Sequence, residues 1–164
     1  MQGKLAPQKV TSIMQFDPVP TLDSIFMVKS LLVAIVKDCA PISDELATTI
    51  LALRKDITNL QTTTHISEFD FSSIDTEFYA ILARLKDYQR LTKIIFEQKL
   101  PIERVIRQSL KQGQSCIPIL RLYDDVLTSI QSHNPALATH KLFELANILE
   151  VYTAKVGSYY SEFS

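Results

Sequence analysis

The residues best suited to metal binding are the histidines His65, His133 and His140, and their surroundings do not favour a metal site. Metal sites in helical bundles use Glu-x-x-His pairs on facing helices, and no Glu precedes any of these histidines by three residues. Glu68 instead follows His65 by three residues, in a segment that we expect to be a loop. A pair in that order and place is typical of solvated surface, so we predict no metal site.

The candidate nucleophiles are Cys39 and Cys116, which belong to no CxxC motif or Cys/His array. Catalysis would need a histidine beside one of them in space. Both cysteines stand among apolar residues at expected helix boundaries, which favours two buried free thiols over a catalytic pair or a disulfide. Reduced thiols indicate an intracellular protein, either cytoplasmic or nuclear.

Two other templates for chemistry are incomplete. The glycines Gly3, Gly113 and Gly157 are isolated, whereas a phosphate-binding loop needs several close together. Asp124 and Asp125 are adjacent but lack a third carboxylate at short spacing, so we interpret them as an exposed acidic edge. We therefore favour a non-enzymatic protein without catalytic residues or a cofactor, while an active site assembled from scattered residues stays open.

Positive charge is concentrated in residues 84–111, which hold eight Lys or Arg and three Asp or Glu, a net charge of +5 in a chain of net charge −1. Two sets of cations have the spacing of three and four residues that places side chains on one face of a helix. The sets are Lys86, Arg90 and Lys93, and Arg104, Arg107 and Lys111. A turn at Leu100 and Pro101 could join them into a basic patch for nucleic acid or a phosphorylated or acidic peptide. Two ordinary solvated helix faces are the favoured alternative.

The spacing of apolar residues predicts an all-α fold, either a single-domain bundle or an irregular superhelix of about six helices. We expect a hydrophobic helix at residues 22–39 to lie at its centre, because ten of the twelve residues from 25 to 36 are apolar. This run is shorter than the roughly 20 residues that span a bilayer, and it contains Lys29. We therefore expect no membrane span.

The remaining segments divide into an arm and further helices. Pro7, Pro18 and Pro20 predict an extended N-terminal arm over residues 1–20, docked on its own bundle or on a partner, before a helical domain over residues 21–164. Ser43 is the expected cap of the second helix, and Ser72 or Ser73 that of the third. The later helices are predicted over residues 73–98, 101–112, 115–132 and 134–156.

Four aromatic residues are candidates for docking a partner: Phe69 and Phe71 in an expected loop over residues 62–72, and Tyr159 and Tyr160 in the C-terminal tail, which could also continue the apolar face of the last helix. Packing against the bundle itself is the alternative for each of them. Elimination of catalytic sites favours a non-catalytic helical domain that holds a protein partner as an adaptor, scaffold or regulator. An anion-binding module that uses residues 84–111 is the alternative, and a homo-oligomer stays open.

Overall fold

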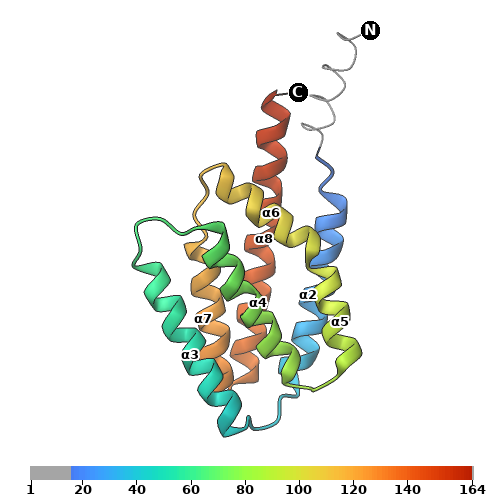
Figure 1. The fold of residues 1–164 in the computed structure, drawn as a ribbon. Helices are drawn as coiled ribbons and strands as arrows, with labels where there is room; N and C mark the ends of the chain where they lie inside the picture. The colour runs from blue at the N-terminus through green and yellow to red at the C-terminus, as the bar shows by residue number, and fades with distance from the viewer. Residues whose placement is uncertain (1–15, 164) are drawn as a thin grey trace.

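The computed structural model describes residues 16–163, and side chains as far as Tyr160. This part of the chain contains helices and connecting turns and no strand, which confirms the predicted all-α fold of a single-domain bundle (Figure 1). The helices are α2 (Val19–Lys37), α3 (Asp44–Gln61), α4 (Glu68–Arg84), α5 (Gln89–Gln98), α6 (Leu100–Lys111), α7 (Ile117–Gln131) and α8 (Pro135–Phe163). Most of the predicted arm, residues 1–15, lies outside the described residues.

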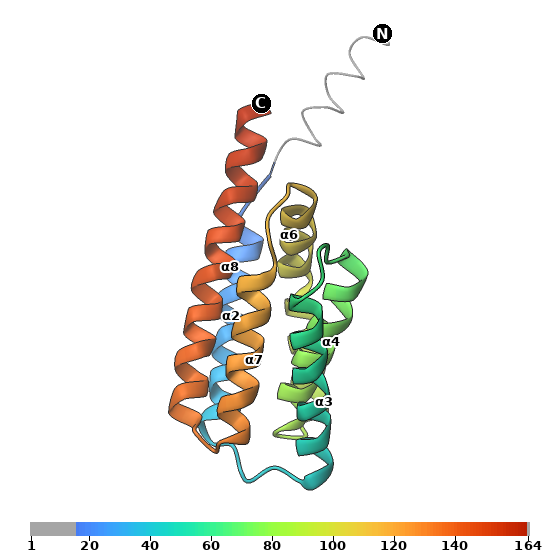
Figure 2. The same cartoon turned by 90° about the vertical axis from the view of Figure 1, so that its left-hand side faces the viewer.

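The helices form two layers. Helices α2, α7 and α8 make up one layer, and α3, α4, α5 and α6 make up the other (Figure 2). Helix α8 packs most extensively against α2 and α7, while α3 packs against α7 and α6 packs against α8 across the two layers. The apolar core fills the space between the layers, because the amphipathic helices turn their apolar stripes toward one another.

Helix α2 belongs to the core on one side only. It contacts α4, α5, α6 and α8, and its inner side buries seven residues: Thr21, Ser24, Ile25, Val28, Leu32, Ile35 and Val36. Its outer side faces solvent, with the Phe26 side chain 64% exposed. The expected hydrophobic helix is therefore present and packs against four other helices, but one of its sides stays exposed.

The predicted third helix starts earlier than expected and is divided in two. Ser67 is the cap that begins α4, since its hydroxyl accepts a hydrogen bond from the Asp70 N–H at 3.0 Å. The chain then leaves the helix after Arg84, and Asp87 adopts the left-handed backbone with φ of 52°. Asp tolerates this conformation better than most residues. A second helix, α5, follows, which raises the count above the predicted six.

Other helix boundaries follow the local sequence. The Ser43 hydroxyl accepts a hydrogen bond from the Leu46 N–H at 3.2 Å, as predicted for the start of α3. The Asn134 side chain accepts one from the Leu137 N–H at 3.1 Å, and Pro135 occupies the first position of α8. Helix α8 continues beyond its predicted end and carries the aromatic tail as part of the same helix.

Candidate functional site on helices α2 and α8

Three exposed apolar side chains and one lysine form a continuous surface on the outer side of α2 and α8. Phe26 on α2 and Phe143 on α8 are 64% and 46% exposed, and Leu22 lies one turn before Phe26. The Lys29 Nζ lies 5.0 Å from the centre of the Phe26 ring and 5.2 Å from that of Phe143. The lysine therefore joins the two rings, and we call Leu22, Phe26, Lys29 and Phe143 the aromatic face.

The helical spacing of α2 explains why Phe26 is exposed. Phe26 lies one turn before Ser30, whose hydroxyl donates a hydrogen bond to the Phe26 carbonyl at 2.7 Å. Ser30 and Lys37 mark the polar stripe of this helix, and Phe26 occupies the same stripe. Sequence reasoning missed this residue because the surrounding run is apolar, although its distance of four residues from Ser30 was a usable signal.

Lys29 carries a positive charge that no described carboxylate neutralises by an ion pair. Lys29 lines a small hollow together with buried residues of both helices, including Val28 and Leu142. The carboxylate of Glu144, the residue next to Phe143, is instead shared by His140 at 3.0 Å and Lys141 at 3.4 Å. The Lys29 ammonium lies over the two aromatic rings, a cation–π arrangement worth about 0.5–1 kcal/mol at exposed sites.

The predicted basic residues are mostly exposed, but they do not form two regular stripes. Lys86 lies in the turn between α4 and α5, where its Nζ donates to the Asp38 carbonyl at 3.1 Å. The first set therefore does not line one helix. Lys93 lies 3.9 Å from Glu97 on α5. The remaining members are exposed and make no ion pair with a described side chain: Arg90, Arg104, Arg107 and Lys111.

The four predicted docking aromatics have different environments. Phe71 is 4% exposed inside α4, so it is a core residue and the prediction that it docks a partner is corrected. Phe69 is 81% exposed in the first turn of the same helix. The Tyr160 ring stacks on Phe16 with centroids 6.1 Å apart, and Tyr159 contacts Tyr160 edge-on at 5.9 Å. Phe69 and Tyr159 thus keep exposed surface, and docking by them stays a prediction.

A buried ionic cluster, absent from the sequence-based predictions, links α4, α6 and α7. The Lys99 side chain is fully buried, and its Nζ donates to the Asp75 Oδ2 at 2.7 Å and also pairs with Glu103. The Tyr123 hydroxyl donates to the other oxygen of Asp75, and the Lys99 ammonium lies 4.7 Å from the Tyr79 ring. Each member thereby has a partner, which buried charges require.

The environment of this cluster fits a structural role. Burial raises the pKa of the Asp75 carboxyl, although the Lys99 charge acts in the opposite direction, and burial raises the pKa of Tyr123 well above its usual range. The adjoining cavity has a volume of about 30 Å³ and is bordered by Asp75, Glu103 and Arg107. That volume is close to the share of one water molecule in the liquid, so the cavity does not fit a cofactor.

A concavity of about 480 Å³ lies between the α3–α4 and α6–α7 turns, and its lining includes His65, Lys111 and Cys116. Burial raises the pKa of the Cys116 thiol to about 11. The thiol is therefore protonated near neutral pH, whereas a nucleophilic cysteine needs a lowered pKa. The concavity therefore offers space, but its cysteine is not activated.

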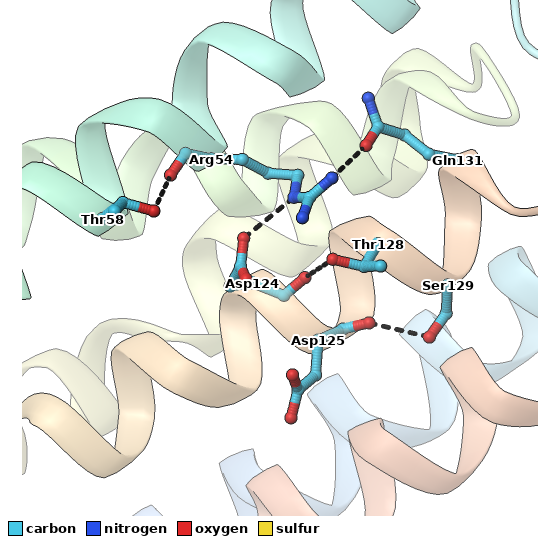
Figure 3. A network of polar contacts seen from close by, with 7 residues as sticks. All are labelled: Arg54, Thr58, Asp124, Asp125, Thr128, Ser129 and Gln131. Atoms are coloured by element: carbon cyan, nitrogen blue, oxygen red, sulfur yellow. Dashed lines mark hydrogen bonds and ion pairs between the residues drawn. The ribbon is translucent and has the colours of Figure 1, made fainter.

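The two aspartates predicted to form an exposed acidic edge instead connect three helices. Asp124 accepts a hydrogen bond from the Arg54 Nε at 2.9 Å, and the same guanidinium donates to Gln131 at 2.6 Å (Figure 3). Asp125 lies 3.5 Å from the Lys141 Nζ on α8. Helix α7 is thus connected to α3 on one side and to α8 on the other.

A metal site, a membrane span and known relatives give no further indication of the function of this chain. Among the residues that the structure describes, no three His, Cys, Asp or Glu side chains are grouped to hold a metal ion. Helix α2 is long and apolar enough to cross a membrane, a test that the core helices of soluble proteins also pass. Comparison with protein families, curated proteins and solved structures finds no match.

Proposed function

We propose that the protein is a non-catalytic helical domain that binds a protein partner through the aromatic face. The observation that carries this proposal is the exposure of Phe26 and Phe143 on either side of Lys29. Aromatic residues are enriched in the binding surfaces of proteins and are depleted from solvated surface. An adaptor, scaffold or regulator that acts in the cytoplasm or nucleus would use such a surface, and the free thiols Cys39 and Cys116 support that compartment.

Energetics support a binding role for these side chains. A large apolar side chain that stays exposed to water lacks the roughly 1.5–3 kcal/mol of stabilisation that its full burial would contribute. Polar residues at Phe26 and Phe143 would leave the core unchanged, because both rings lie on the outer side of their helices. The positions therefore favour recognition over folding as the role of these rings.

The proposal is tested by capture of partners from the native host with the wild-type protein and a Phe26→Ser, Phe143→Ser variant. Proteins that bind this surface should be lost from the variant, and quantitative mass spectrometry would measure the loss. Phe69→Ser is the matched control, because Phe69 is also exposed but lies on α4 in the other layer. Equal capture by all three proteins would contradict the proposal.

An anion-binding function is the second candidate, and the α6 cations favour it. Arg104, Arg107 and Lys111 are exposed at spacings of three and four residues on one helix. They make no ion pair with a described side chain, so their charge is available to a phosphate or a carboxylate. Salt-dependent binding of a phosphate ligand that is lost on charge reversal of these residues would separate this candidate from the first.

A further inference from the structure

We infer that the partner segment of the aromatic face is an amphipathic helix whose apolar stripe includes one Asp or Glu that pairs with Lys29. This inference rests on the proposed function and specifies the chemistry of the partner. It follows from two features of the face: an ammonium at its centre, and apolar side chains that follow the period of a helix.

The Lys29 ammonium sets the charge of the partner. A segment that covers Phe26 and Phe143 would also remove water from the Nζ between them. The two rings compensate only part of the lost hydration, and no described carboxylate pairs with this lysine. A carboxylate from the partner would neutralise the charge at the place where water is excluded.

The spacing along α2 fits a helical partner. Val19, Leu22 and Phe26 are all exposed at intervals of three and four residues, so they form one ridge about 10 Å long. Phe143 adds a contact from the neighbouring helix. A helix with apolar residues at i, i+3, i+4 and i+7 matches a ridge of this period, as in other helix-binding surfaces.

Two other occupants fit the face less well. In a symmetric dimer with Lys29 near the twofold axis, two ammonium groups would come together as the surface loses water, which is unfavourable. A membrane-binding helix carries several Lys or Arg on its polar side. Lys29 is the one cation among the residues that define the aromatic face, and exposed Asp23 adjoins Leu22.

The experiment selects binders from a displayed library of random peptides about 14 residues long, the length of an average helix. The target is the full chain, and peptides that also bind the Phe26→Ser, Phe143→Ser variant are removed. We expect the remaining peptides to share a helical apolar pattern with a central Asp or Glu. Lys29→Met should weaken their binding about 30-fold or more, and replacement of the peptide carboxylate by its amide should do the same.

Selected peptides without an acidic residue, or with equal affinity for Lys29→Met, would overturn the inference while leaving the proposed function intact. If no peptide distinguishes the wild type from the double variant, both fail. Binding to phosphatidylserine vesicles that depends on Lys29, without peptide binding, would assign the face to lipid. Self-association that is lost in the double variant, measured by sedimentation, would assign it to a second copy. Thermal unfolding of each variant checks that it remains folded.

Discussion

Lys99 and Asp75 form an ion pair at 2.7 Å with both side chains withdrawn from water, although 24 residues separate them in the chain. Asp75 belongs to α4, and Lys99 lies at the junction of α5 and α6. Tyr123 of α7 completes the arrangement by donating to the same carboxylate. The pair therefore fixes the junction of two helices against the core, and it makes the position of α6 dependent on buried charges.

Removal of one member of this pair should be costly. In Lys99→Met, the Asp75 carboxylate would stay buried without its cation, so we expect a loss of about 3–5 kcal/mol in the free energy of unfolding. The double variant Asp75→Asn, Lys99→Met should recover much of that loss, because the amide still accepts from Tyr123 and the remaining carboxylate, Glu103, is partly exposed to solvent. Urea denaturation measures the free energy of unfolding of both variants. Wild-type stability of the single variant would show that the pair is not buried as described.

The start of α4 gives a matched pair of serine substitutions. Ser67→Ala removes the hydroxyl that accepts from the Asp70 N–H, and it should cost about 1 kcal/mol of stability. Ser72→Ala lies in the interior of the helix on its exposed side, where alanine is the better helix former, so its effect should be neutral or slightly stabilising. Thermal unfolding of both variants measures these two effects on stability. The opposite ranking would place the cap where the sequence alone suggested it.

The Cys116 thiol should react slowly with thiol reagents in the folded protein. Its pKa rises from an ordinary 9.0 to about 11 through burial, so its thiolate fraction near pH 8 should be about 100-fold lower than that of a free thiol. Ellman's reagent applied to a Cys39→Ser variant, with and without denaturant, measures this difference. The pKa of this thiol is lower in the unfolded chain, so the unfolded chain loses the proton first as the pH rises. The contribution of the protonated thiol to the free energy of unfolding should therefore fall between pH 9 and 11. Rapid reaction without denaturant would show that Cys116 is exposed.

Much of the fold could be predicted because its determinants are local. Several features depend on residues close in sequence: the helix class, the Ser43 cap, the start of α8 at Asn134 and Pro135, and the apolar spacing that gives α3, α7 and α8 their buried faces. The break at residues 85–88 could not be predicted, because the apolar spacing continues across it. Its position depends on contacts with distant residues, such as that between Lys86 and the Asp38 carbonyl.

The candidate site was harder to predict for a related reason. A run of ten apolar residues in twelve specifies a buried helix only if enough other helices surround it, and the layer arrangement leaves one side of α2 uncovered. Phe143 joins the face through the packing of α8 on α2, which sequence spacing cannot show. The sequence indicates the buried Asp75–Lys99 pair only weakly. Asp75 stands four residues after Phe71 and three before Phe78, which places a carboxylate on the buried stripe of α4.

Charge reversal tests the anion-binding alternative. The changes Arg90→Glu, Arg104→Glu and Arg107→Glu alter exposed residues that form no ion pair with a described side chain, so the free energy of unfolding should change little. If the basic residues form a phosphate site, the wild type should bind single-stranded RNA, duplex DNA or a phosphopeptide, more weakly as salt rises, and the triple variant should lose this binding. We expect equal behaviour of the two proteins. Salt-dependent binding lost in the variant would favour the alternative.

Photo-crosslinking within the native host tests the central claim most directly. A benzoylphenylalanine placed at Phe26 or Phe143 should form adducts with a partner protein, because these positions define the aromatic face. The same group at Phe69, which is more exposed but lies on α4 in the other layer, should give none of these adducts. Adducts at Phe69 without adducts at Phe26 and Phe143, or no adduct at any of the three positions, would contradict a binding role for α2 and α8.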